Sequence, residues 1–220
     1  MSLRLPHFSA VALFGQDCLL CMATSGNDMV CAACLEALPT LHVSGEPGAA
    51  VVGEFDAICA RYEYRFPVDR LVQRFKYAGD LAVGKWLAAQ LALHARAAPA
   101  PQLLVPMPIT RARLRERGFN QAVEIARVVS RALRVPAAAR ALERTRDAPP
   151  QSRLGRRARR ANLRDAFACT RPLGARHVAL IDDVVTTGAT ASAAARALKR
   201  AGVERVDVWA LALTPGPGDA

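Results

Sequence analysis

Apolar and polar positions follow two different periods along the chain, and the change from one to the other predicts a mixed α/β domain. Short apolar runs predict strands, which we place at 55–64, 102–105, 177–181 and 206–213. Helical spacing, with start and stop signals such as Asn120 and Gly202, predicts helices at 68–77, 81–96, 121–133, 152–163 and 189–201. The final strand, helix and strand indicate a right-handed parallel crossover.

The N-terminal part has a different pattern. Up to about Pro39 it is rich in cysteines and turn residues, and residues 41–53, with Pro47 and three glycines, have the composition of a connection. We therefore expect two domains, a small lobe with its connection at 1–53 and an α/β domain at 54–220.

Four cysteines of the lobe form two short pairs, Cys18-x-x-Cys21 and Cys31-x-x-Cys34, separated by nine residues. This spacing suits a tetrahedral zinc site with four thiolate ligands, which leaves no open position for catalysis. The lobe has no apolar cluster large enough to fold it, so a structural metal is the expected reason that it folds. Iron–sulfur ligation is the alternative.

Hydropathy predicts no membrane insertion, because no apolar run approaches the roughly 18–20 residues that cross a bilayer. The first thirty residues also lack a signal-peptide pattern. We expect a cytoplasmic protein, and disulfides are rare in that reducing compartment, which again favours metal binding by the cysteines.

The apolar run Val178–Ile181 ends in two adjacent acidic residues, Asp182 and Asp183. In open parallel sheets, ligands bind at the carboxyl ends of strands. Neighbouring carboxylates repel each other unless hydroxyl groups or a cation engage them, and a ribose diol supplies such hydroxyls. The sequence therefore predicts a sugar-binding edge of the sheet.

The loop that follows offers hydroxyl donors and a glycine just before a predicted helix N-terminus, where backbone N–H groups are free to bind a phosphate. The loop residues are Thr186, Thr187, Gly188, Ala189 and Thr190. An ordinary Thr/Asp helix cap is the alternative for a Thr-x-Gly-x-Thr pattern taken alone. The Gly-Lys-[Ser/Thr] ending of a nucleotide-hydrolysing P-loop is absent.

Positive charge is concentrated between residues 111 and 164, which hold 16 arginines and 4 acidic residues, a net charge of +12 against +11 for the whole chain. Arg111, Arg113, Arg115 and Arg117 alternate, which in an extended loop would aim them all to one side. A basic helical face is expected around residues 153–160. Such runs fit a polyanionic partner, a diphosphate or a nucleic acid, although a solvated surface is the alternative.

The aspartate pair and the Thr/Gly loop resemble the type I phosphoribosyltransferases. That resemblance implies that Asp182 and Asp183 are the catalytic-site residues that hold the ribose hydroxyls, and that Thr186 to Thr190 hold the 5′-phosphate of phosphoribosyl pyrophosphate (PRPP). It also implies Mg²⁺ on the pyrophosphate.

Further motifs resemble the ComF family over nearly the whole chain. They are Phe75-Lys76-Tyr77-Ala78-Gly79-Asp80, Pro106-Met107-Pro108, Arg117-Gly118-Phe119-Asn120-Gln121-Ala122, and a set with Gln151, Leu154, Arg159, Asn162 and Phe167. The resemblance implies a type I phosphoribosyltransferase-like parallel sheet flanked by helices, with a small N-terminal zinc-binding lobe that uses four cysteines. It adds Arg117, Asn120, Gln151 and Arg159 as substrate-binding residues. One departure is Ala148, where the family pattern has a threonine.

Two functions remain open at this point. The first is a Mg²⁺-dependent phosphoribosyltransferase whose acceptor the sequence does not identify. The second is a cytosolic competence factor that binds single-stranded DNA on its basic surface and uses the phosphate pocket as a sensor or strand grip. Family likeness associates both with DNA uptake or use of external DNA, and with proteins of the competence machinery. Lys76 is expected either to bind a phosphate or to be an ordinary surface lysine of an amphipathic helix.

Overall fold

The computed structural model describes residues 15–41, 53–145 and 166–214. Two compact units divide the chain between Leu38 and Pro39. Each unit is described by itself.

The N-terminal unit is built on turns around the four cysteines. One short helix, α1 (Ala32–Glu36), and an isolated bridge between Asp17 and Thr24 are its regular elements within the described residues. Helix α1 begins directly after Cys31, so the second cysteine pair is held by the first turn of a helix.

A four-stranded parallel sheet forms the second unit, as the sequence predicts. Its spatial order is β1-β6-β5-β2, and every neighbouring pair is parallel. The strands are β1 (Ala57–Glu63), β2 (Leu103–Pro106), β5 (His177–Val185) and β6 (Arg205–Leu213). Because all four run in one direction, their carboxyl ends lie along the same edge of the sheet.

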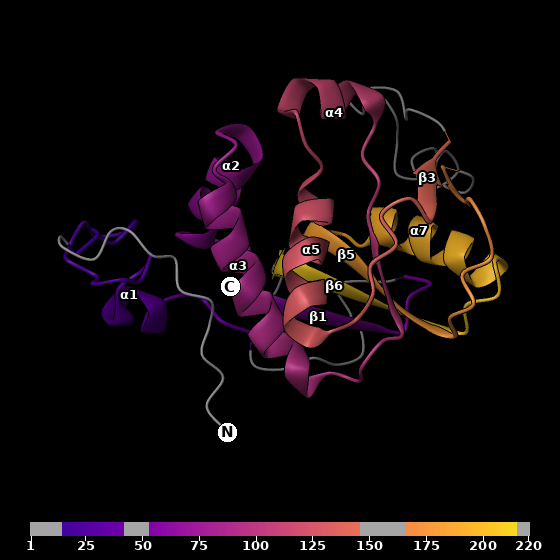
Figure 1. The fold of residues 1–220 in the computed structure, drawn as a ribbon, viewed down its shortest axis with the longest axis horizontal. Coiled ribbons are helices and arrows are strands. Elements are labelled where there is room, and N and C mark those ends of the chain that lie inside the picture. The colour runs from indigo at the N-terminus through magenta and orange to yellow at the C-terminus, as the bar shows by residue number, and fades with distance from the viewer. Residues whose placement is uncertain (1–14, 42–52, 146–165, 215–220) are drawn as a thin grey trace. The chain divides into compact units, whose positions relative to one another are not determined.

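Helices cover both faces of this sheet (Figure 1). Helices α3 (Leu81–His94) and α5 (Gln121–Leu133) lie side by side over one face, and α2 (Val68–Tyr77) packs against α3. Helix α7 (Ala189–Arg200) covers the opposite face. A short 3₁₀ helix, η1 (Ala95–Ala97), follows α3.

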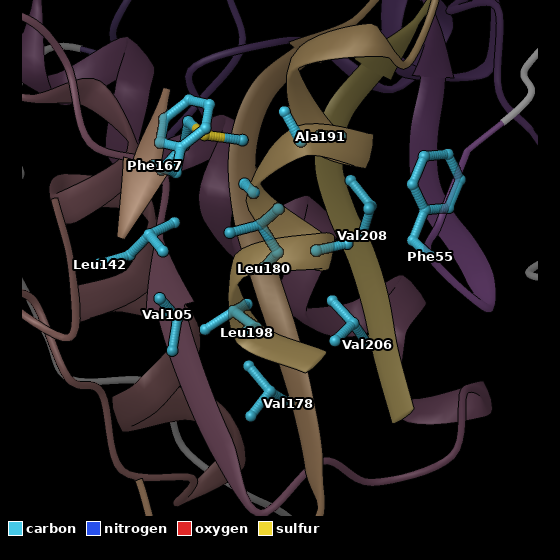
Figure 2. Close-up of a cluster of buried hydrophobic side chains, with 14 of the residues drawn as sticks. Phe55, Val105, Leu142, Phe167, Val178, Leu180, Ala191, Leu198, Val206 and Val208 are labelled. Carbon is cyan, nitrogen blue, oxygen red and sulfur yellow. The ribbon is translucent and has the colours of Figure 1, made fainter. Parts of the chain in front are cut away.

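The core between the sheet and α7 follows from the two-residue period of the strands. Val178 and Leu180 of β5 project toward α7, where Leu198 lies against them in Figure 2, together with Val206 and Val208 of β6. All five side chains are fully buried. The apolar run that predicted a strand buried on both faces is thus confirmed for β5.

Three features differ from the sequence-based prediction. First, β5 extends beyond Ile181 through both aspartates to Val185, because Val184 and Val185 pair with Ala212 and Leu213 of β6. The carboxylates therefore lie within the last part of the strand.

Second, the arginine-rich stretch is a helix, α4 (Arg111–Arg117), and the expectation of an extended loop is wrong. Thr110 caps its N-terminus through a hydrogen bond from the N–H of Arg113, and Gly118, in a left-handed conformation, ends it. On a helix, alternate residues spread around the axis, so the arginines of α4 do not share one side.

Third, a separate two-stranded antiparallel sheet, β3 (Leu142–Arg144) with β4 (Phe167–Cys169), was not predicted. These strands bracket residues 146–165, which include the helix expected at 152–163 and lie outside the described residues. Phe167 and Leu142 join the core beside α7.

Within the described ranges, no helix combines the length and apolar character that spanning a membrane requires.

Candidate functional site

The aspartate pair lies at the carboxyl edge of the sheet, on the central strand β5. Asp182 is paired in register with Ala210 of β6, and both aspartates are half-buried. Each carboxylate accepts a hydrogen bond from the next backbone N–H: Asp183 N to Asp182 Oδ1 at 2.9 Å, and Val184 N to Asp183 Oδ1 at 2.6 Å. Successive side chains of a strand point to opposite faces, so the two carboxyl groups meet different surroundings, but both lie within three residues of the end of β5, at the same edge of the sheet.

Asp183 is engaged by a cation. The Nζ atom of Lys76, at the end of α2, lies 2.9 Å from Asp183 Oδ1, and the two side chains are only 16% and 13% exposed. The alternative that Lys76 is an ordinary surface lysine is therefore wrong. Its position on α2 explains why: Val68, Val72 and Lys76 follow one another at four-residue spacing along the helix face that is buried at Val68 and Val72.

Asp182 has a different electrostatic environment. Burial raises its pKa to about 7, and the neighbouring negative charge of Asp183 acts in the same direction. The N–H of Asp183 and the charges of Lys76 and Arg113 oppose the rise. The two adjacent aspartates therefore have different environments: Asp183 is paired with Lys76, and burial favours the neutral form of Asp182.

The Thr/Gly loop connects β5 directly to the N-terminus of α7. Thr186, Thr187 and Thr190 are exposed, and Gly188 occupies the N-cap position with φ of 72°, a left-handed conformation that glycine adopts without strain. Among the described residues, no side chain caps this helix end. The first N–H groups of α7 have no partner within the helix and are available to an anion.

The loop after β2 lies beside the aspartates, because β2 pairs with β5. Pro106 is in register with Ile181, and the N–H of Met107 donates to the Ile181 carbonyl oxygen at 2.8 Å. Asn120 fixes this loop from the other side: its Nδ2 donates to the Met107 carbonyl oxygen, and its Oδ1 accepts from the N–H of Ala122, both at 3.0 Å. Asn120 therefore caps α5 and holds the loop through the same amide.

Two of the sequence motifs pack against each other. The rings of Phe75 and Phe119 lie 5.6 Å apart, and the guanidinium of Arg117 lies over the ring of Tyr77 at 5.1 Å from its centroid. Arg117 Nη1 also donates to Gln121 Oε1 at 3.1 Å. The end of α2, the end of α4 and the start of α5 thus form one cluster, and Lys76 of α2 connects it to Asp183.

A surface pocket of 240 Å³ opens on this cluster, lined by Lys76, Tyr77, Ala78, Gly79, Glu116 and Arg117. Two buried donor atoms of the cluster, Arg117 Nε and Gln121 Nε2, have no hydrogen-bond partner among the described residues. Unsatisfied buried donors are rare in native proteins and are typical of sites completed by a ligand or by water.

The predicted site residues thus separate into three groups. Asp182, Asp183 and the loop Thr186 to Thr190 lie together on β5 and at the start of α7. Arg117 lies at the neighbouring pocket, and Asn120 supports the loop after β2. Gln151 and Arg159 lie outside the described residues. The sequence left Lys76 undecided and missed Tyr77, although both belong to a family motif.

The donor set at β5 fits a magnesium ion that is shared with a ligand's phosphates. Mg²⁺ binds oxygen ligands and is usually held by one or two carboxylates, with water and phosphate oxygens completing its shell. Asp182 and Asp183 supply such carboxylates, and one oxygen of Asp183 already bonds Lys76.

The four cysteines Cys18, Cys21, Cys31 and Cys34 form a candidate metal centre. Their sulfur atoms all lie within 4.8 Å of one another, and the Sγ atoms of Cys21 and Cys31 are 3.7 Å apart. Tetrahedral zinc with Zn–S bonds of about 2.3 Å requires sulfur atoms about 3.8 Å apart. The cluster could therefore bind a metal such as zinc, as the spacing predicts.

Backbone geometry also favours a thiolate at Cys18. The N–H groups of Leu20 and Cys31 each donate to Cys18 Sγ at 3.4 Å. The bond from Cys31 lowers the pKa of Cys18 to about 6, whereas a hydrogen bond with Cys21 raises the pKa of Cys34 to about 12. A metal ion would replace the protons that these crowded thiols share.

The parallel sheet flanked by helices, with its acidic and hydroxyl-lined carboxyl edge, defines an α/β protein with a separate four-cysteine unit. No family model matches the chain. Competence protein F of Haemophilus influenzae is 34% identical over 158 residues, which cover 68% of this chain and 69% of that protein. DNA utilization protein YhgH of Escherichia coli K12 is 35% identical over 158 residues, covering 69% and 70%. The chain therefore belongs to the ComF family.

Solved structures with a similar chain path include the glutamine PRPP amidotransferase of B. subtilis, with a TM-score of 0.41 and 18% identity over 64% of this chain and 30% of that one. A purine phosphoribosyltransferase from Pyrococcus horikoshii has a TM-score of 0.33 and 16% identity, over 62% and 75%. At these values the likeness does not bear on function.

Proposed function

We propose that this protein binds PRPP, or a closely related sugar phosphate, together with Mg²⁺ at the carboxyl end of β5. The observation that supports this most directly is that carboxyl groups and a hydroxyl-rich turn lie together at one edge of the sheet. Asp182 and Asp183 lie on the strand, and Thr186 to Thr190 follow at an uncapped helix N-terminus. The first group suits vicinal hydroxyls, and the second suits a phosphate dianion.

Different residues would bind different parts of the ligand. The two aspartates accept hydrogen bonds from the ribose hydroxyls, and the loop donates N–H and O–H groups to the 5′-phosphate. Magnesium, when bound, neutralises the diphosphate and makes it a better leaving group. Gln151 and Arg159 complete the predicted substrate-binding set, with Arg117 beside the pocket.

In the cell, we infer a role in DNA uptake or use of external DNA. The relatives at 34% and 35% identity carry the names Competence protein F and DNA utilization protein. A cytoplasmic protein with a sugar-phosphate site would serve there alongside other proteins of the competence machinery. A deletion strain should show reduced transformation, or reduced growth on external DNA, and Asp182→Asn in the chromosomal copy should reproduce the defect.

Isothermal titration calorimetry with PRPP and MgCl₂ tests the binding proposal. Asp182→Asn combined with Asp183→Asn should weaken PRPP about 100-fold or more, since hydrogen bonds to charged groups contribute about 1.5–3 kcal/mol each and at least two are lost. Glu204→Gln is the matched control, because Glu204 precedes β6 at the opposite edge of the sheet and is exposed. Absence of PRPP binding to the wild type would contradict the proposal.

Turnover requires a separate measurement. In the transferase reaction the anomeric carbon loses pyrophosphate and forms a bond to an acceptor nucleophile, so pyrophosphate release depends on the acceptor. Incubation with PRPP, Mg²⁺ and a panel of nucleobases and amines should release pyrophosphate for an enzyme. Release with none of them supports a binding role for the same site.

Single-stranded DNA binding is the second candidate. Arg111, Arg113 and Arg115 of α4 are all exposed, and α4 follows the strand β2 from the same edge of the sheet. Binding through phosphates makes log Kobs fall linearly with log salt, with a slope of about 0.7 per contact on single strands. Arg111→Gln with Arg115→Gln should reduce that slope, and Arg171→Gln with Arg176→Gln, two exposed arginines preceding β5, is the charge-matched control.

A further inference from the structure

Lys76 is a charged residue at a largely buried position of α2. It lies on the buried face of α2, where an apolar side chain would pack with less loss of hydration. Its side chain is 16% exposed, and its ammonium group is directed to Asp183 Oδ1 at 2.9 Å. A charged residue on the core side of a helix, paired with a carboxylate at a sheet edge, indicates a functional requirement.

The same lysine also lines the 240 Å³ pocket, together with Arg117 and Glu116. Lys76 therefore bonds the carboxylate of Asp183 and borders a pocket in which an anionic group would be a second acceptor. One ammonium group on a flexible stem has three donors and can turn from one acceptor to another. The guanidinium of Arg117, held against Tyr77 and Gln121, supplies a fixed second charge at that pocket.

We propose that Lys76 determines the specificity of the sugar-phosphate site for a diphosphate. In the free protein its ammonium group is the counter-ion of Asp183. When the ligand binds, the ammonium turns to a diphosphate oxygen in the pocket, and Asp183 accepts the ribose hydroxyls in its place. This inference rests on the proposed function.

The exchange keeps every charge compensated. Asp183 loses its counter-ion only when the hydroxyl donors and the metal ion of the ligand bind. Lys76 at the same time exchanges the Asp183 carboxylate for a diphosphate oxygen. A sugar monophosphate offers hydroxyls and a 5′-phosphate but no group for Lys76 in the pocket. Such a ligand leaves the Lys76 to Asp183 ion pair in competition with its own hydroxyl groups. The site should therefore prefer the diphosphate.

Calorimetry with two ligands tests this role. We expect Lys76→Met to weaken PRPP about 10- to 100-fold, the range for loss of a charged hydrogen bond. The affinity for ribose 5-phosphate should rise slightly, by less than about threefold, because the competing ion pair is gone. Lys76→Arg should recover part of the preference, because it keeps the charge but loses the compact ammonium group. Lys85→Met, an exposed lysine on α3, is the matched control and should leave both affinities unchanged.

Each other outcome overturns the inference. An equal loss for both ligands would show that Lys76 only supports the local structure, and unchanged affinities would show that it does not contact the ligand. Lys76→Arg guards against a misfolded Lys76→Met, because a folded arginine variant with wild-type preference and affinity would also contradict the role. Failure of the wild type to bind either ligand would overturn the proposed function itself and is seen without any variant.

Discussion

The Nζ atom of Lys76 lies 2.9 Å from Oδ1 of Asp183, and this contact joins the end of α2 to the carboxyl end of β5. It makes the two adjacent aspartates unequal. Asp183 has a cationic partner, whereas burial raises the pKa of Asp182 to about 7. Two carboxyl groups that look equivalent in the sequence thus have different electrostatic environments.

Asp182→Asn should stabilise the protein in a pH-dependent way. The pKa of Asp182 is raised from 3.8 to about 7 in the folded state, so the folded protein favours the neutral form. That advantage is fully present below about pH 4 and is lost as the pH rises through 7. The variant should therefore melt at a higher temperature than the wild type, by a difference that grows between about pH 4 and pH 7 and is constant above. Each kcal/mol of stabilisation corresponds to about 2–4 °C in melting temperature for a chain of this size.

Asp56→Asn provides the contrasting control for that series. Although burial acts to raise its pKa, the N–H of Val206 and the ammonium group of Lys199 together hold the pKa of Asp56 below its usual value. Its stabilising effect should be present above about pH 4 and vanish on acidification, so the asparagine variant should be less stable at neutral pH. A flat difference for Asp182→Asn across the range would contradict the environment described for Asp182.

Gly188→Ala should weaken phosphate binding as well as stability. Gly188 has φ of 72° at the start of α7, and an alanine in a left-handed conformation costs about 1–2 kcal/mol. Under the proposed function the N–H groups that follow Gly188 bind the phosphate, so strain at this position should also disturb binding. Gly202→Ala is the matched control, because Gly202 has φ of 93° and open space around a Cβ atom. Thermal melts should show a loss for both variants, and PRPP titration a loss for Gly188→Ala alone.

Asn120 variants should separate two roles of one amide. Asn120→Ala removes the cap of α5 and the bond to the Met107 carbonyl oxygen, and should cost about 1–2 kcal/mol of stability. Asn120→Asp keeps an acceptor for the N–H of Ala122 but loses the donor to Met107. We expect near-normal melting of the aspartate variant with weakened PRPP binding, measured by titration. Normal binding by both variants would show that the loop after β2 does not contribute.

Metal content should depend on the cysteine cluster alone. Purified protein should contain about one zinc per chain, released by a chelator or by acid because protons compete for the thiolates. Cys18→Ser should lose the metal, whereas Cys169→Ser, a cysteine outside the cluster whose Sγ donates to the Arg171 carbonyl oxygen, should keep it. Elemental analysis measures the zinc content of each variant. An absorption spectrum with visible charge-transfer bands would instead indicate an iron–sulfur cluster.

The sequence predicted the strands and helices well where the local pattern is strong. Residues 68–77 form the expected helix, and the parallel sheet and the four-cysteine cluster are confirmed. It failed at Arg111–Arg117, where alternating arginines suggested an extended loop and the caps at Thr110 and Gly118 produce a helix. It also missed β3 and β4, since three-residue strands carry too little pattern to be recognised.

The sequence by itself determined the parts that depend on neighbouring residues: the buried strand that ends in aspartates, the hydroxyl-rich turn before α7, and the paired cysteines. Only the tertiary structure decided what each polar group does. Lys76 bonds Asp183 across elements that are far apart in the chain, and Asn120 bonds back to Met107 across the whole of α4. Spacing along a sequence fixes periodicity and caps, but the charge state of a carboxyl group and the partner of an amide depend on burial and distance in space.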